Sequence, residues 1–343
     1  MSEHTVVVTD HDFADLSIER DGLEDIAEVV ELTGDVGEEV EDAHETLARA
    51  DAVINLRYDL DQEAIDALTG CRVISRYGIG VDNIDVEAAA EREIPVTNVP
   101  DYCLEEVSVH ALTLYLALAR GLKSYDADVA AGGWDRGVAT PIHRLSTRTV
   151  GVVGYGAIGR AVGERADALG MDVVASDPFL TEDDVAGDPA TLVAFEELLA
   201  EADFVTVHSP LVPETRGMFD ADAFARMNED AYFVNVARGP IVDGEALADA
   251  LDAGEIAGAG LDVFPEEPPA ADDPLRDHPK VLTTPHVAWY SEEANDQRRR
   301  TVTEIVRTVR RRRPLERRQR LRTARRSAFR GSTLRGSGEQ KRR

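Results

Sequence analysis

Short apolar runs alternate with polar-faced helical stretches along most of the chain. In the first hundred residues, the apolar runs are short enough to be buried strands, and helical patterns at 61–68 and 86–92 follow two of them. The predicted strands cover residues 5–9, 52–56, 71–76 and 95–99. Strands that alternate with helices are typical of crossover units in a parallel sheet. We therefore predict a first α/β domain here.

A second series of the same kind begins near residue 149. Its predicted strands cover residues 150–153, 172–176, 204–208, 232–236, 258–262 and 281–283. Helical segments lie between most of them, which indicates a doubly wound parallel sheet with its ligand at the carboxyl ends of the strands. Before this series, residues 105–119 are apolar almost all round, so we expect a helix buried between domains or subunits.

Length and composition agree with two domains. A chain of 343 residues with 43% hydrophobic content exceeds the usual size of one domain. We find no apolar stretch long enough for a membrane span and no secretory layout in the first twenty residues, so we expect a soluble, cytoplasmic protein without a membrane partner. The two cysteines, Cys71 and Cys103, have no metal-ligand spacing, and we predict no metal site.

Charge is divided unevenly along the chain. Residues 1–297 carry 18 Lys and Arg against 63 Asp and Glu, whereas residues 298–343 carry 19 against three. Such an acidic body repels itself at low salt, so we expect a surface adapted to a halophilic cytoplasm. The Arg-rich segment 313–343 lacks apolar periodicity, and we expect a disordered basic tail. It could instead be a nucleic-acid arm, an accessory extension or the product of a reading-frame change.

A glycine-rich turn joins the strand at 150–153 to the helix predicted from about 158 to 169. Gly154 permits the tight turn, Gly156 lets a pyrophosphate approach the backbone, and Gly159 allows close contact between helix and strand. Eighteen residues after Gly159, Asp177 ends the next strand and could accept hydrogen bonds from both ribose hydroxyls while repelling a 2′-phosphate. The pattern favours NAD over NADP, although Asp177 could simply cap a turn before Pro178.

Three later segments read N-V-A-R-G-P at 235–240, G-L-D-V-F-P-E-E-P at 260–268 and T-P-H-V-A-W-Y at 284–290. With R-Y-G-I-G-V-D-N-I-D at 76–85 and N-V-P-D-Y at 98–102, their order and spacing resemble the D-isomer-specific 2-hydroxyacid dehydrogenases. The resemblance covers roughly residues 50–310. In the segment A-W-Y-S-E-E, the chain most resembles the C-terminal-binding-protein branch, and elsewhere it resembles phosphoglycerate dehydrogenases. The acidic body suggests a haloarchaeal source.

The resemblance implies a role for each motif. His286 would be the base that takes the hydroxyl proton, Glu267 would fix its tautomer, and Arg238 would grip the substrate carboxylate. Asp262 would hydrogen-bond the nicotinamide carboxamide. Further implied contacts to the cofactor are Ala157, Ile158, Pro210, Thr215 and Ala237, and those to the substrate are Arg76, Gly78, Ile79, Gly80 and Trp289.

Each of these residues also has a plainer interpretation. Arg238 could be a surface charge, Glu267 part of a solvated turn and His286 structural, while Trp289 could be core packing. The glycines at 78 and 80 could form an ordinary turn. The joint order of the three motifs favours the catalytic interpretation.

The family's organisation implies two Rossmann-like domains, with the active site in a cleft between them and a homodimer formed through the cofactor domains. Residues 1–100 and 287–312 would bind substrate, and residues 101–286 would bind NAD. We expect an NAD-dependent oxidoreductase acting on a small 2-hydroxy or 2-oxo acid, possible substrates being 3-phosphoglycerate, glyoxylate, hydroxypyruvate or a longer acid. The alternative is an NAD-sensing adaptor, with nucleic acid bound only through the tail.

Overall fold

A computed structural model of the chain describes residues 4–33 and 42–311. The chain divides into two compact units. Unit 1 contains the residues up to Asn98 and those from Arg299 onward, whereas unit 2 runs from Val99 to Arg298. The predicted basic tail at 313–343 lies outside the described residues.

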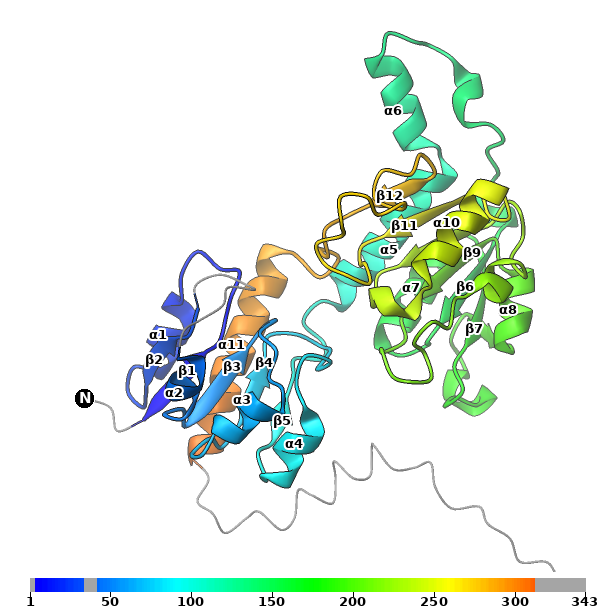
Figure 1. Ribbon diagram of the computed structural model, residues 1–343. Helices are drawn as coiled ribbons and strands as arrows, with labels where there is room; N and C mark the ends of the chain where they lie inside the picture. Colours follow the sequence, from blue (N-terminus) through cyan, green and yellow to red (C-terminus); the bar gives the residue numbers. More distant parts are fainter. Residues whose placement is uncertain (1–3, 34–41, 312–343) are drawn as a thin grey trace, which may run out of the picture. The chain divides into compact units, whose positions relative to one another are not determined.

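Unit 1 is built on a parallel sheet of five strands in the order β2-β1-β3-β4-β5 (Figure 1). The strands are β1 (Thr5–Val8), β2 (Glu28–Glu31), β3 (Ala52–Asn55), β4 (Ile74–Arg76) and β5 (Val96–Thr97). Its helices are α1 (Ser17–Leu23), α2 (Ala43–Leu47), α3 (Gln62–Ala67), α4 (Val86–Glu91) and the second part of α11 (Glu292–Arg311). The four predicted strands are confirmed, and the edge strand β2 was not predicted because it contains only two apolar residues.

Unit 2 is built on a parallel sheet of seven strands in the order β12-β11-β10-β9-β6-β7-β8. The strands are β6 (Thr149–Val153), β7 (Asp172–Ser176), β8 (Ala190–Leu192), β9 (Phe204–Val207), β10 (Tyr232–Asn235), β11 (Gly258–Leu261) and β12 (Val281–Thr283). All six predicted strands are present. The chain winds outward in both directions from β6, so the topological switch point lies at the carboxyl ends of β6 and β9, as a doubly wound fold requires.

The helices of unit 2 cover this sheet, except where the arm that begins with α6 stands away from it (Figure 1). They are α5 (Leu104–Ala119), α6 (Leu122–Ala130), α7 (Ala157–Ala168), α8 (Phe195–Glu201), α9 (Ala221–Phe224) and α10 (Gly244–Ala253), and the first part of α11 also belongs to this unit. Short 3-10 helices occupy Arg136–Ala139, Leu145–Thr147, Glu182–Val185 and Gly239–Ile241.

Helix α5 explains the apolar stretch at 105–119. It packs on β10, β11 and α7 of its own unit, and the ring of Tyr115 stacks on that of Phe204 with centroids 4.1 Å apart. Ala111 and Leu114 are buried in the same contact. Much of the burial that we expected between domains or subunits therefore lies inside unit 2.

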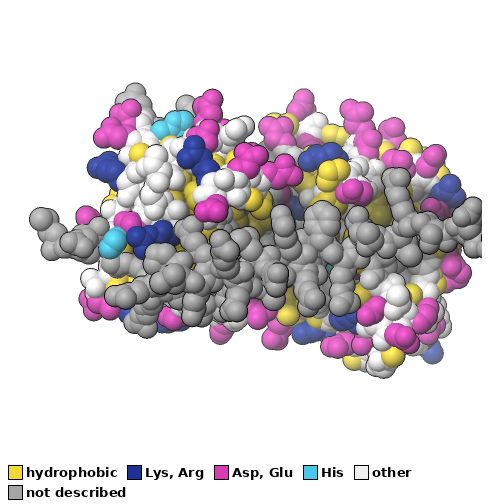
Figure 2. Space-filling model, turned by 90° about the horizontal axis from the view of Figure 1, so that it is seen from below, with side chains coloured by type: hydrophobic (Ala, Val, Ile, Leu, Met, Phe, Trp, Pro, Cys, Tyr) yellow, Lys and Arg dark blue, Asp and Glu magenta, His cyan; other side chains and the backbone are white. Residues whose placement is uncertain are grey.

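On the part of the face that Figure 2 shows in colour, acidic side chains are widespread and Lys and Arg are fewer. Both cysteines are free thiols. Burial raises the pKa of Cys71 to about 11 and that of Cys103 to about 12, so neither forms a reactive thiolate near neutral pH.

Among the described helices, we find none with the length and apolarity needed to cross a membrane.

Candidate active site

The glycine-rich turn follows β6 at the switch point. Gly154 has φ +88°, a left-handed conformation that favours glycine, and a Cβ on it would lie 2.7 Å from the backbone nitrogen of Ser209. A Cβ on Gly159 would lie 2.3 Å from the carbonyl oxygen of Gly154, so only glycine permits α7 to begin this close to β6. A Cβ on Gly156 would meet nothing within 4 Å. The three glycines thus match the roles predicted for a pyrophosphate turn.

Ala157 and Ile158 are the first residues of α7, directly after the turn. Their position places the amino-terminal amides and the positive end of the helix dipole beside the open backbone at Gly156. A helix of 12 residues that starts this way offers donors to a dinucleotide phosphate. The local structure therefore suits the cofactor predicted from the sequence.

Asp177 follows β7 and is hydrogen-bonded on both carboxylate oxygens. Oδ2 accepts the amide of Tyr155 in the glycine turn at 3.0 Å, and Oδ1 accepts the amide of Phe179 at 3.0 Å. The second bond is the turn cap that we considered as the plainer role. The first bond links Asp177 to the glycine turn, so the cap and the cofactor role are compatible.

The loop after β9 lies against the glycine turn through Ser209. Thr215 donates its hydroxyl to the carbonyl of Pro210 at 2.7 Å and accepts the amide of Val212 at 2.9 Å, which closes the loop on itself. Desolvation lowers the pKa of His208 to about 3, so this imidazole is neutral at physiological pH. We did not predict His208. The signal available was its position as the last residue of the strand predicted at 204–208, at the switch point.

Arg238 lies in the turn after β10, and this turn is held by a buried amide. Asn235, 1% exposed, donates to the carbonyl of Arg238 at 2.8 Å and accepts the amide of Ala237 at 3.0 Å. Gly239 packs directly on the next loop, where a Cβ would lie 1.9 Å from the carbonyl carbon of Phe264. The loops that carry Arg238 and Glu267 are therefore in contact, and Asn235 is a supporting residue that the sequence did not reveal.

Glu267 and His286 form a close pair. Oε2 of Glu267 lies 2.6 Å from Nδ1 of His286, and Oε1 accepts the amide of Phe264 at 3.1 Å. The two side chains are 31% and 29% exposed, so solvent and small molecules can reach them. Nδ1 of His286 faces the carboxylate, whereas Nε2 is the ring nitrogen that does not. This pairing is the arrangement expected of a base with its orienting acid.

Asp262 holds the turn that carries His286. Its carboxylate is 1% exposed and accepts the hydroxyl of Thr284 at 2.6 Å and the amides of Val287 and Ala288 at 2.9 Å each. Its carbonyl also accepts the amide of His286 at 2.7 Å. Asp262 therefore has a positioning role that the sequence did not suggest. Its contact with the nicotinamide carboxamide stays a prediction.

Trp289 lies three residues beyond His286 and is half-buried. Its indole nitrogen donates to the carbonyl of His286 at 2.9 Å, and its ring lies 6.4 Å from that of Tyr102. The packing role that we considered is therefore real. A contact with substrate stays a prediction.

In unit 1, Arg76 is the last residue of β4. Its Nε donates to Oδ1 of Asn83 at 3.0 Å, and a Cβ on Gly78 would lie 2.4 Å from its Nη1. Glycine at 78 therefore lets the guanidinium lie against the loop backbone. The carbonyl of Ile79 accepts Nδ2 of Asn98 at 2.6 Å, and Gly80 follows in the same loop.

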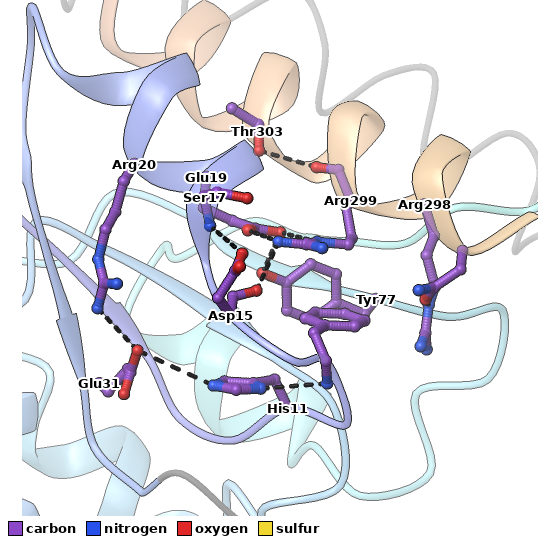
Figure 3. A network of polar contacts seen from close by, with 12 residues as sticks. His11, Asp15, Ser17, Glu19, Arg20, Glu31, Tyr77, Arg298, Arg299 and Thr303 are labelled. Carbon is purple, nitrogen blue, oxygen red and sulfur yellow. Dashed lines mark hydrogen bonds and ion pairs between the residues drawn. The ribbon is translucent and has the colours of Figure 1, made fainter. Parts of the chain in front are cut away.

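A buried cluster anchors the loop that follows Arg76 (Figure 3). The hydroxyl of Tyr77 donates to Glu19 at 3.0 Å, and Arg299 binds both oxygens of Glu19 at 2.9 and 2.6 Å. Tyr77 and Glu19 are 0% exposed, and the guanidinium of Arg299 lies 4.3 Å from the ring centroid of Phe13. Tyr77 thus fixes the loop from inside while its neighbour Arg76 stays accessible.

Adjacent strands explain why three separated motifs meet in unit 2. The loops that carry Arg238, Glu267 and His286 follow β10, β11 and β12, which are neighbours in the sheet. The carboxyl ends of parallel strands lie at the same end of the sheet, and the glycine turn lies at that end too. Within the described residues, no group of three His, Cys, Asp or Glu side chains could hold a metal ion.

Comparisons with known proteins agree with this geometry. Residues 112–288 match the model of the family described as D-isomer specific 2-hydroxyacid dehydrogenase, NAD binding domain. A D-3-phosphoglycerate dehydrogenase of Archaeoglobus fulgidus is 41% identical over 242 residues, which cover 71% of this chain and 46% of that protein. The chain spans about half the length of the curated relatives it matches first.

Solved structures show the same fold over nearly the whole chain. A D-lactate dehydrogenase from Aquifex aeolicus, complexed with NAD and lactic acid, has a TM-score of 0.81 and 27% identity and covers 88% of this chain and 94% of that one. A glyoxylate reductase from Paecilomyes thermophila has a TM-score of 0.81 and 27% identity, covering 90% and 95%.

Proposed function

Since the chain belongs to the D-isomer specific 2-hydroxyacid dehydrogenase family and contains its NAD-binding domain, we propose that it is an NAD-dependent dehydrogenase. Its substrate would be a small 2-hydroxy acid, or the matching 2-oxo acid when it acts as a reductase. The observation that carries the proposal is the pairing of Glu267 with His286 at 2.6 Å, in a loop neighbouring that of Arg238. The glycine turn and Asp177 also lie at the carboxyl ends of the strands in this sheet.

In the oxidation, Nε2 of His286 takes the hydroxyl proton while the hydrogen on C2 leaves with its electron pair as hydride. A nicotinamide cofactor held at the glycine turn and Asp177 would supply the acceptor for that hydride. Glu267 stabilises the imidazolium that forms, and the reverse reaction returns the proton to the carbonyl oxygen. Arg238 binds the substrate carboxylate with its planar guanidinium and polarises the C2 oxygen.

We further propose that Arg76 and the amides of Gly78, Ile79 and Gly80 bind the same carboxylate. Trp289 would limit the size of the substrate side chain. The relatives named D-3-phosphoglycerate dehydrogenase make 3-phosphoglycerate one member of the substrate class to be tested, together with lactate, glyoxylate and hydroxypyruvate.

We also propose a cytoplasmic homodimer formed through the cofactor domain. The arm that begins with α6 exposes large apolar side chains, of which Trp134 is 91% exposed, Leu122 56% and Val129 53%. A second copy would remove this apolar surface from water. Light scattering of the purified chain distinguishes a dimer from a monomer.

The activity is tested by NADH oxidation with a panel of 2-oxo acids, in dilute buffer and in molar KCl. We expect turnover of at least one member, and loss of that turnover in the His286→Ala variant. An absence of turnover across the whole panel, with NADH still bound, would favour an NAD-sensing adaptor.

A further inference from the structure

The backbone of His286 adopts a conformation that is uncommon for residues other than glycine. Its φ is +54°, in the left-handed region that residues with a side chain seldom adopt. Such a conformation is held by contacts from neighbouring residues and is common at sites where a side chain must point in one direction. The contacts that hold His286 therefore decide where its imidazole lies.

Three hydrogen bonds hold the backbone of His286, one of which runs from its amide to the carbonyl of Thr284 at 3.1 Å. Its amide donates to the carbonyl of Asp262 at 2.7 Å, inside the turn that Asp262 organises. Its carbonyl accepts the indole N–H of Trp289 at 2.9 Å. The bond from Trp289 comes from a side chain, so the backbone conformation of His286 depends on how firmly the Trp289 ring is fixed.

Arg298 fixes that ring. Its guanidinium carbon lies 3.9 Å from the centroid of the Trp289 ring, well within the range of a cation–π contact. Arg298 is 1% exposed, and its Nε donates to Oδ1 of Asn295 at 3.0 Å. A buried guanidinium with a fixed orientation is a rigid platform, and Tyr290 packs edge-on against the ring at 5.3 Å.

We propose that Arg298 and Trp289 are a positioning pair for the base: Arg298 orients the indole, and the indole N–H keeps His286 in the left-handed conformation that directs its imidazole to Glu267. The proposal rests on the proposed dehydrogenase function. It assigns to Arg298 a role in catalysis although Arg298 need not touch the substrate. A misplacement of about 1 Å at a reacting group can lower the rate roughly 100-fold, so a positioning pair affects kcat.

The test compares Trp289→Phe, which keeps an aromatic ring but loses the N–H, with Arg298→Met and Arg298→Lys. Wild type and variants are assayed with NADH and the best 2-oxo acid of the panel, and NADH binding is followed by fluorescence. We expect Trp289→Phe and Arg298→Met to lower kcat by roughly tenfold or more, with the NADH Kd changed less than about twofold. In Arg298→Met, KM should also change less than about twofold, because Arg298 does not touch the substrate. Arg298→Lys keeps the positive charge but loses the planar group that lies over the indole, so it should recover only part of the loss.

The double variant gives a sharper result. If Arg298 acts through Trp289, Trp289→Phe combined with Arg298→Met should be little slower than Trp289→Phe alone. Tyr290→Phe is the matched control, because it removes the adjacent bond to Glu292 at 2.7 Å and leaves the indole in place. Independent, multiplicative losses, or a rise in KM alone, would overturn the proposal.

A crystal structure of Trp289→Phe decides the proposal without activity. We expect His286 to leave the left-handed region or its Nδ1 to move out of hydrogen-bond distance of Glu267. An unchanged turn would contradict the positioning role. If wild type turns over no 2-oxo acid while this turn does change, the dehydrogenase function fails and the structural role of the pair stands.

Discussion

Nδ1 of His286 lies 2.6 Å from Oε2 of Glu267, although 19 residues separate them in the sequence. Glu267 is itself held by the amide of Phe264, so the carboxylate has one defined direction. In the proposed reaction, this pair leaves Nε2 of His286 to face the substrate.

Glu267→Gln keeps the size of the side chain and removes its charge. We expect kcat to fall by roughly 100- to 10 000-fold, the usual contribution of general acid–base catalysis, because the imidazolium loses its stabilising partner. Steady-state kinetics with a 2-oxo acid measure the loss. Glu266→Gln, one residue away and exposed, is the control and should keep wild-type kcat.

Asp177→Asn keeps an oxygen that can accept a backbone amide and removes the negative charge. We expect the ratio of kcat/KM for NADH over NADPH to fall roughly tenfold or more, because a like charge opposite the 2′-phosphate is removed. Parallel assays with the two cofactors measure the ratio. Asp183→Asn, on the exposed segment that follows, should leave it unchanged, and equal ratios for Asp177→Asn and wild type would refute the role.

Gly239→Ala adds a methyl group where no space exists. Its Cβ would lie 1.9 Å from backbone of Phe264, so we expect a loss of about 1–3 kcal/mol in the free energy of unfolding, together with lower kcat. Urea unfolding measures the first effect. Gly244→Ala is the matched control, since its Cβ would make an ordinary 3.7 Å contact with Leu275. Equal stability of the two variants would show that the two loops are not tightly packed.

His208 should make the fold sensitive to acid. Burial lowers the pKa of His208 from its ordinary value of 6.5 to about 3, so the unfolded chain binds a proton more readily. The stabilising contribution is complete above pH 6.5 and is lost as the pH falls toward 3. We expect His208→Gln to lose less stability than wild type between pH 7 and pH 5 in urea unfolding. His44→Gln, exposed on α2, should behave as wild type does.

Salt should stabilise this protein. The acidic surface seen in Figure 2 repels itself, and raising KCl from 0.1 to 1 M shortens the screening length from about 10 to about 3 Å. We expect Tm and activity to rise over that range, measured by thermal unfolding and by NADH oxidation. A loss of activity in molar KCl would argue against a halophilic protein.

Local patterns in the sequence predicted most of the fold. Buried parallel strands are short apolar runs, so ten of the strands could be recognised, whereas β2 and β8 lie at sheet edges and carry too little apolar sequence. The glycine turn was equally readable, because the need for glycine at 154 and 159 arises from close backbone contacts within one strand–helix unit.

The sequence by itself determined ten of the strands and the glycine turn, because each depends on residues a few positions apart. It also singled out Arg238, Glu267 and His286, through the order and spacing of their motifs. Only the tertiary structure decided what holds them in place. Asp262 acts through contacts with Val287 and Ala288, which form only when the loops after β11 and β12 meet. Asn235 acts within its own turn, and Trp289 and Arg298 meet where the turn after His286 packs on the start of α11. Such contacts leave no periodic trace in the chain, because packing sets them and local backbone preference does not.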